Sequence, residues 1–81
     1  MIEFNNDSIG KTIRRLRLEK GQSQEFLSSW AGIARSHLSM IETGTKQANF
    51  ETLWKIANAL DMKPSDFVRE IEDDLKKSAA K

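Results

Sequence analysis

The sequence predicts an all-α protein in which five short helices pack into one bundle. Apolar residues recur at the helical spacings i, i+3 and i+4 through five segments of the 81-residue chain. Capping residues, glycine or proline bound these segments, and no stretch alternates in the way that a half-buried strand would. A chain of this length supports one small domain, whose core must be efficient.

The first helix is expected to start among the capping candidates at residues 5–8 and to end at Gly21. Its inward positions are Ile9, Ile13 and Leu16, at helical spacing. Basic residues outnumber acidic ones in residues 11–20, five against one. This bias suits contact with phosphates, and a solvated helix face explains it equally well.

Residues 24–42 predict two short helices joined by a tight turn, the unit around which the chain is organised. Ser23 caps the first of these helices, and Gly32 can take the positive φ that a sharp turn requires. The second helix should begin near residue 34 or 35 and end at Gly44, with Leu38 and Ile41 facing inward. One helix then braces the other, which is presented outward.

The last two helices follow a polar loop at residues 43–49. Asn49 is the expected cap of the fourth helix, and Pro64 the first residue of the fifth. The acidic stretch at residues 70–74 is interpreted as a solvated face, and residues 76–81 are expected to fray. The apolar stripe of the fifth helix consists of Phe67, Val68, Ile71 and Leu75.

Composition excludes several classes of function. The chain has no cysteine and a single histidine, His37, so thiolate chemistry and a metal site built from these residues are excluded. We find no phosphate-binding glycine loop and no acid–base constellation, so nothing supports an enzyme, a cofactor or a small-molecule ligand. The sequence shows no membrane span or secretion signal, and the expectation is a cytoplasmic protein.

Several independent motifs agree with one another along the chain. Arg17 lies in the first helix, Ser-Gln-Glu opens the second, Ala-Gly-Ile forms the turn and Ile-Glu-x-Gly closes the third. The fourth helix carries Leu-x-x-Ile-Ala-x-x-Leu. Over residues 9–68 these motifs resemble the Xre/Cro/cI-type helix-turn-helix family. The resemblance implies a lambda-repressor-like fold that binds double-stranded DNA as a homodimer on a palindromic operator. The small size also resembles the controller proteins of restriction–modification systems.

The resemblance assigns residues 1–70 to a DNA-binding domain and residues 71–81 to a C-terminal helix extension and tail. It also implies a role for each matching position. The positions that face base edges are Arg35, Ser36, Ser39 and Met40. Those that contact the DNA backbone are Gln24, Thr43, Lys46 and His37. Arg17 and Glu42 match a salt bridge between the first and third helices.

Four of these roles have alternatives. Arg35 and Ser36 are interpreted as base readers, with a phosphate contact or a plain surface residue as the alternatives. His37 lies on the flank of the third helix and touches either the DNA backbone or the first helix. Met40 stands where a polar side chain is common, and it either touches a thymine methyl group or is partly buried. Ala34 replaces the usual Ser or Thr cap, and Thr43 replaces a frequent Arg or Asn.

The aromatic side chains of the second and fourth helices need a separate explanation. We expect a dimer surface formed by Trp54, Val68, Ile71 and Leu75; the alternative for Trp54 is half-burial against the fifth helix. Phe26 and Trp30 stand where the family has polar residues. They either pack against the N-terminal arm, at Ile2 and Phe4, or contact a partner protein.

The sequence therefore predicts a DNA-binding transcriptional regulator. The alternatives are an antitoxin-like subunit that neutralises a partner protein, and a helical bundle without a nucleic-acid partner.

Overall fold

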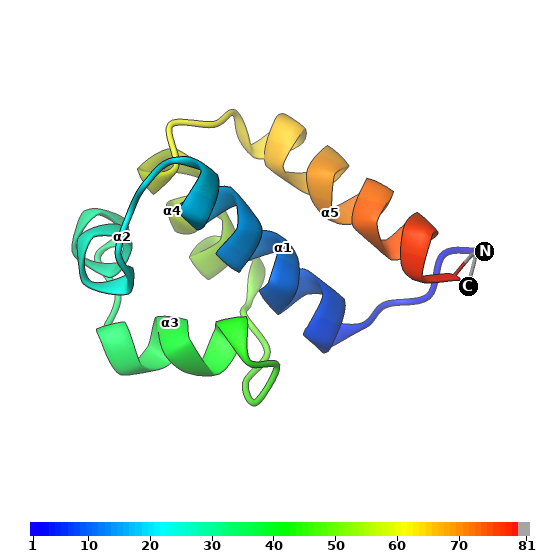
Figure 1. Ribbon diagram of the computed structural model, residues 1–81, viewed down its shortest axis with the longest axis horizontal. Coiled ribbons are helices and arrows are strands. Elements are labelled where there is room, and N and C mark those ends of the chain that lie inside the picture. The colour runs from blue at the N-terminus through cyan, green and yellow to red at the C-terminus, as the bar shows by residue number, and fades with distance from the viewer. Residues whose placement is uncertain (80–81) are drawn as a thin grey trace.

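The computed structural model describes residues 1–79 and contains five helices and no strand within that range. They are α1 (Asn6–Glu19), α2 (Gln24–Ala31), α3 (Arg35–Glu42), α4 (Phe50–Ala59) and α5 (Pro64–Ala79). The all-α prediction is confirmed. Helix α1 lies between α3 and α5 and contacts both, while α2 packs against α3 and α4 (Figure 1). Within residues 1–79, no helix is both long and apolar enough to cross a bilayer.

The helix starts follow from local sequence signals. The Asn5 side chain accepts hydrogen bonds from the backbone N–H groups of Asp7 and Ser8, and thereby caps α1. Ser23 caps α2 through the N–H of Phe26 at 3.0 Å, and Asn49 caps α4 in the same way. Each cap satisfies donors that have no partner inside the helix.

One side chain or more from every helix meets in a single core. Burying such a side chain completely is worth about 1.5–3 kcal/mol, so this core supplies most of the favourable energy of folding. Phe67 is the largest of them and is 1% exposed. The fully buried apolar side chains are Ile13 of α1, Leu27 of α2, Leu38 and Ile41 of α3, Ile56 and Ala57 of α4, and Phe67 of α5, together with Leu60.

Helices α1 and α3 cross with almost no space between their backbones. The crossing point is Gly10, where an added Cβ would overlap the carbonyl oxygens of Ile41 and Glu42. A glycine normally weakens a helix interior, but here its missing side chain permits the contact. Gly10 therefore places the C-terminal end of α3 directly on α1.

Polar contacts hold the C-terminal half of α5 against α1. Arg15 binds the carboxylates of Glu70 at 2.8 Å and Asp74 at 3.1 Å, so the acidic stretch is more than the solvated face that we expected. Thr12 also donates to Asp74, and Ser8 and Ser78 share a hydrogen bond. Residues 76–79 are helical, so fraying was the wrong expectation for them. Residues 80 and 81 lie outside the described part of the chain.

Candidate nucleic-acid interface

Helix α3 is anchored on one side and open on the other. Leu38 and Ile41 are 0% and 2% exposed, because they pack into the core. Arg35 and Ser36 are exposed, whereas Ser39, Met40 and His37 are partly buried. In Figure 1, α3 lies along the edge of the molecule opposite α5. Helix α3 is therefore held rigidly by its apolar face, and its polar face is free to contact a nucleic acid.

The turn before α3 is tight. Gly32 has a φ of 72°, and Ile33 donates its N–H to the Ser28 carbonyl at 3.0 Å. Ala34 occupies the cap position of α3 and makes no side-chain hydrogen bond, as its replacement of Ser or Thr implies. The first N–H groups of α3 therefore have no side-chain cap.

A buried ion pair fixes the other end of α3. The carboxylate of Glu42 accepts hydrogen bonds from Arg17 Nε at 2.8 Å and Nη2 at 3.0 Å. Their side chains are only 2% and 8% exposed, and Arg17 Nη1 also donates to the Gln22 carbonyl. The pair thus joins α3 to α1 and to the turn that follows α1. Arg17 consequently has a structural role at this position.

Gln24 belongs to the same network, which the sequence did not reveal. Its Nε2 donates to Glu42 Oε1 at 3.1 Å, and this bond ties the first turn of α2 to the last residue of α3. Nε2 carries a second N–H, which can donate a hydrogen bond to another acceptor such as a phosphate oxygen. The backbone contact of Gln24 stays a prediction, with its side chain oriented by Glu42.

The segment after α3 folds back on the end of that helix. Thr45 and Lys46 donate their backbone N–H groups to the Met40 carbonyl, at 2.9 and 3.2 Å, and Gly44 turns the chain with a φ of 79°. The Thr43 hydroxyl bonds to the same carbonyl and to the Thr45 hydroxyl. Thr43, Thr45 and Lys46 are all exposed. Thr45 lies between two predicted backbone contacts, Thr43 and Lys46, and no role was assigned to it from the sequence.

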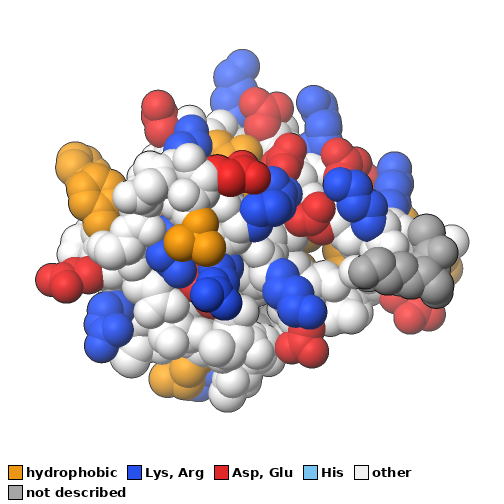
Figure 2. All heavy atoms as spheres, in the orientation of Figure 1, with side chains coloured by type: hydrophobic (Ala, Val, Ile, Leu, Met, Phe, Trp, Pro, Cys, Tyr) orange, Lys and Arg blue, Asp and Glu red, His pale blue; other side chains and the backbone are white. Residues whose placement is uncertain are grey.

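This surface carries little charge. The residues predicted to contact DNA include one arginine, Arg35, and one lysine, Lys46. In Figure 2 the surface over α3 is mostly uncharged, while Lys and Arg side chains lie over α1 with acidic side chains among them. Positive charge is therefore available beside the α3 surface as well as on it.

Comparison with known proteins agrees with this arrangement. The sequence model of the helix-turn-helix family matches residues 13–67, which include α2, its turn and α3. The chain belongs to the helix-turn-helix family. This helix-turn-helix protein is 35% identical over 60 residues to the control protein C.BamHI of Bacillus amyloliquefaciens. The aligned region covers 73% of this chain and 74% of the relative.

Solved structures show the same fold. The restriction–modification controller protein C.AhdI from Aeromonas hydrophila superimposes with a TM-score of 0.72 and 35% identity, over 80% of this chain and 92% of that one. The restriction–modification controller C.Esp1396I has been solved as a tetramer in complex with its natural 35 base-pair operator. One chain of it matches with a TM-score of 0.83 and 25% identity, covering 90% and 96% of the two chains. The resemblance that the motifs suggested is confirmed.

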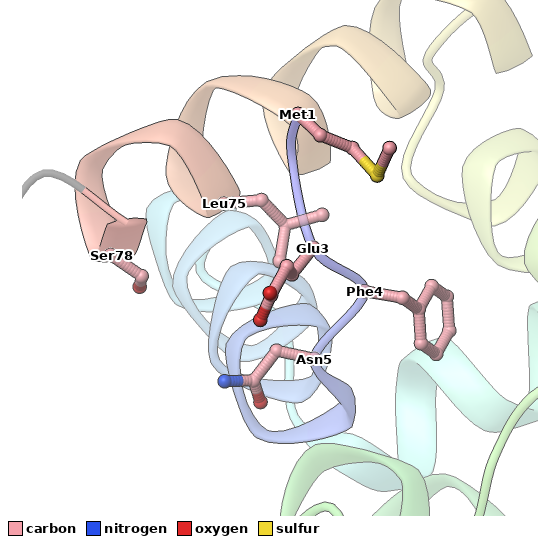
Figure 3. Close-up of a pocket in the computed structure, with 6 residues that line it drawn as sticks. All are labelled: Met1, Glu3, Phe4, Asn5, Leu75 and Ser78. Carbon is pink, nitrogen blue, oxygen red and sulfur yellow. The ribbon is translucent and has the colours of Figure 1, made fainter.

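The structure corrects the predicted dimer surface of this helix-turn-helix protein. Ile71 is 7% exposed and belongs to the core, so its assignment to a surface is wrong. Leu75 is partly buried and packs against the core, and Figure 3 shows its side chain beside the N-terminal arm near Glu3. Trp54 and Val68 are 48% and 46% exposed.

A further aromatic residue lies next to Trp54. The Phe50 ring is 5.9 Å from the Trp54 ring, centroid to centroid, and Phe50 is 67% exposed. Sequence reasoning missed Phe50, although its i, i+4 spacing from Trp54 was a usable signal. Phe50 and Trp54 on α4 and Val68 on α5 are now the candidate dimer residues.

The aromatic pair on α2 does not pack against the N-terminal arm. Phe26 and Trp30 lie against each other, with ring centroids 6.0 Å apart, and they are 47% and 70% exposed. The N-terminus lies beside the end of α5, at the opposite side of the molecule from α2 (Figure 1). The packing alternative is therefore wrong, and both rings remain on the surface.

Proposed function

We propose that this protein is a sequence-specific DNA-binding transcriptional regulator that acts as a homodimer on a palindromic operator. One observation carries the proposal: α3 presents a free polar face, while its opposite face and its C-terminal end are locked to the core and to α1. The family membership and the operator complex of the relative C.Esp1396I support it.

The geometry of the homodimer follows from its two-fold symmetry. Each protomer inserts α3 into a major groove, and the two α3 helices lie about 34 Å apart, one turn of DNA. The apolar side chains of Phe50, Trp54 and Val68 supply the contact between protomers. An isologous contact of this kind explains why large apolar side chains are exposed on the protomer.

Arg35 and Ser36 supply most of the base discrimination in this proposal. Both lie in the first turn of α3 and are exposed. An arginine that binds guanine through two hydrogen bonds is worth about 1–3 kcal/mol against the wrong base. Ser39 and Met40 lie one turn further along the helix, and Met40 offers an apolar contact to a thymine methyl group.

The remaining contacts hold the DNA backbone. Gln24, Thr43 and Lys46 surround α3 at the start of α2 and in the turn after α3, and His37 lies on the flank of α3. Phosphate contacts set the register of the protein on the duplex, and base contacts select the sequence. The light charge of α3 means that affinity depends strongly on these contacts and on dimerisation.

Selection of binding sites from a pool of random duplexes tests the proposal. We expect the purified protein to enrich one palindrome, and Arg35→Ala to relax the preference at one position of each half-site. Arg69→Ala, an exposed arginine on α5, is the control and keeps the selected sequence. Enrichment of no palindrome would contradict the regulator; equal weakening of all sites by Arg35→Ala would make Arg35 a phosphate ligand.

The exposed Phe26–Trp30 pair favours a second candidate function, an antitoxin-like subunit that binds a partner protein. Tryptophan is enriched among the few side chains that carry most of the binding energy near the centre of a protein interface. Coexpression with the products of neighbouring genes tests this candidate. A stoichiometric complex that Trp30→Ala abolishes would support it, and Lys55→Ala on α4 is the control. Full binding by the Trp30→Ala protein would contradict it.

A further inference from the structure

One stripe of α1 runs along the C-terminal end of α3. Its members are spaced three, four and three residues apart, which places them on one helix face. They are Asp7, Gly10, Arg14 and Arg17. Since α1 continues unbroken from Asn6 to Glu19, the spacing holds along the whole stripe.

Three members of the stripe, Asp7, Gly10 and Arg17, contact α3 or the turn after it. The Asp7 carboxylate occupies the place that a Cβ on Gly44 would take, and Gly10 lies against the carbonyl oxygens of Ile41 and Glu42. Arg17 binds the Glu42 carboxylate. The stripe is therefore the side of α1 that faces the C-terminal end of α3.

Arg14 is the member whose side chain is held by no hydrogen bond or ion pair within residues 1–79. It lies between Gly10 and Arg17 on the helix and is exposed, and it takes part in none of the ion pairs found within residues 1–79. In Figure 2, Lys and Arg side chains lie over α1, next to the uncharged surface of α3. Its neighbour Arg15, in contrast, is bound to Glu19, Glu70 and Asp74.

Arg14 lies where a DNA phosphate backbone would run if α3 entered the major groove. When a helix enters the major groove, the two phosphate backbones rise on either side of it. A guanidinium group next to the C-terminal end of that helix meets one of these backbones, where Thr43 and Lys46 are also predicted to make contact. Arginine binds phosphate through two parallel hydrogen bonds, and its charge persists at every physiological pH.

We propose that Arg14 contacts a DNA phosphate from α1, outside the helix-turn-helix unit, and that it raises affinity without reading sequence. This inference rests on the proposed function, because it requires α3 to enter the major groove. Within residues 1–79, the Arg14 side chain makes no hydrogen bond or ion pair to the rest of the fold. Its removal therefore changes DNA binding and leaves the fold intact.

The salt dependence of binding separates a phosphate contact from a merely solvated arginine. The probes are a duplex enriched by the wild-type protein and a scrambled duplex of equal length, each titrated over a series of salt concentrations. Each phosphate contact adds about 0.9 to the magnitude of the negative slope of log K against log salt. Arg14→Gln removes one contact from each protomer, so it should lower this magnitude by about 1.8 per dimer. The loss is the same on both duplexes. Arg14→Lys restores most of the slope.

Arg69→Gln on α5 is the matched control and keeps the wild-type slope, since α1 separates α5 from α3 (Figure 1). Thermal unfolding of each variant verifies that the fold is unchanged. An Arg14→Gln slope equal to that of the wild type overturns the inference, and so does a loss confined to the enriched duplex. If the wild type prefers no sequence, the regulator proposal fails while the scrambled duplex still tests Arg14; a wild type that binds neither duplex overturns both.

Discussion

The carboxylate of Glu42 accepts two hydrogen bonds from the guanidinium group of Arg17, from Nε at 2.8 Å and from Nη2 at 3.0 Å. Glu42 is the last residue of α3, and Arg17 lies in the last turn of α1. Gln24 adds a third hydrogen bond to the same carboxylate. One buried carboxylate therefore sets the position of α3 relative to both α1 and α2.

Removing the arginine leaves the Glu42 charge buried without its partner. We expect Arg17→Met to lower the free energy of unfolding by about 3–5 kcal/mol, measured by denaturant titration. The control is Arg69→Ala, because the Arg69–Asp66 pair is exposed and 3.8 Å long. Such a pair contributes about 0–1 kcal/mol.

The double variant Arg17→Met/Glu42→Leu separates charge from packing. It removes both charges, so it should recover much of the stability that Arg17→Met loses. A single variant as stable as the wild type would show that Glu42 is not held by this pair in solution.

At Gly10, we expect a Gly→Ala substitution to lower stability, whereas the same substitution inside most helices raises it. Gly→Ala inside a helix ordinarily stabilises by about 0.5–1 kcal/mol. At Gly10 the added methyl group would push against backbone carbonyls of α3, which cannot move aside. Gly10→Ala should therefore destabilise by about 1–3 kcal/mol, as overpacking does.

Thermal unfolding measures this effect. Lys11→Ala, on the exposed face of α1 next to Gly10, is the matched control and should change stability by less than about 0.5 kcal/mol. A Gly10→Ala protein that melts above the wild type would mean that α1 and α3 are not in contact at this point.

The elements were predictable because their signals are local. Asn5, Ser23 and Asn49 act as caps within three residues of the groups that they satisfy, and Pro64 opens α5 as its fixed φ favours. These signals depend on the chain nearby and not on the packing of the bundle. Helix existence and order therefore followed from the sequence.

Inter-helix contacts were not predictable in the same way. Ile71 and Val68 share one apolar stripe, yet Ile71 enters the core and Val68 faces outward. A stripe does not say which of its edges meets the neighbouring helix. Gly10 had no visible role for the same reason, since its importance arises only where α3 crosses α1.

The contact between Asp74 and α1 predicts a pH dependence of stability. Burial would raise the pKa of Asp74, but hydrogen bonds from Thr12 and Arg15 outweigh it and lower the pKa below its ordinary value. A depressed pKa in the folded protein gives stability that is fully present above the unfolded pKa, about 3.9. That stability is lost as the pH falls through the folded value.

Asp74→Asn isolates this contribution. The variant should be about 1 kcal/mol less stable than the wild type at pH 7, because it loses charged hydrogen bonds at a partly exposed site. The difference should shrink below about pH 4, where the wild-type carboxylate becomes protonated. Denaturant titrations at a series of pH values measure both proteins. A difference that stays constant down to pH 2.5 would contradict the contact.

Phe50 and Trp54 on α4 and Val68 on α5 expose apolar side chains, and we expect the two protomers to meet there. Val68→Asp places a charge on an apolar contact that excludes water, so the dimer should dissociate. Sedimentation equilibrium at micromolar concentration should then give a monomer, and the variant should bind a single half-site without cooperativity. Trp30→Ala, which removes an exposed aromatic ring from α2, is the control and keeps the dimer. If Trp30→Ala dissociates the dimer and Val68→Asp does not, the two protomers meet through α2, and the surface on α4 and α5 has another role.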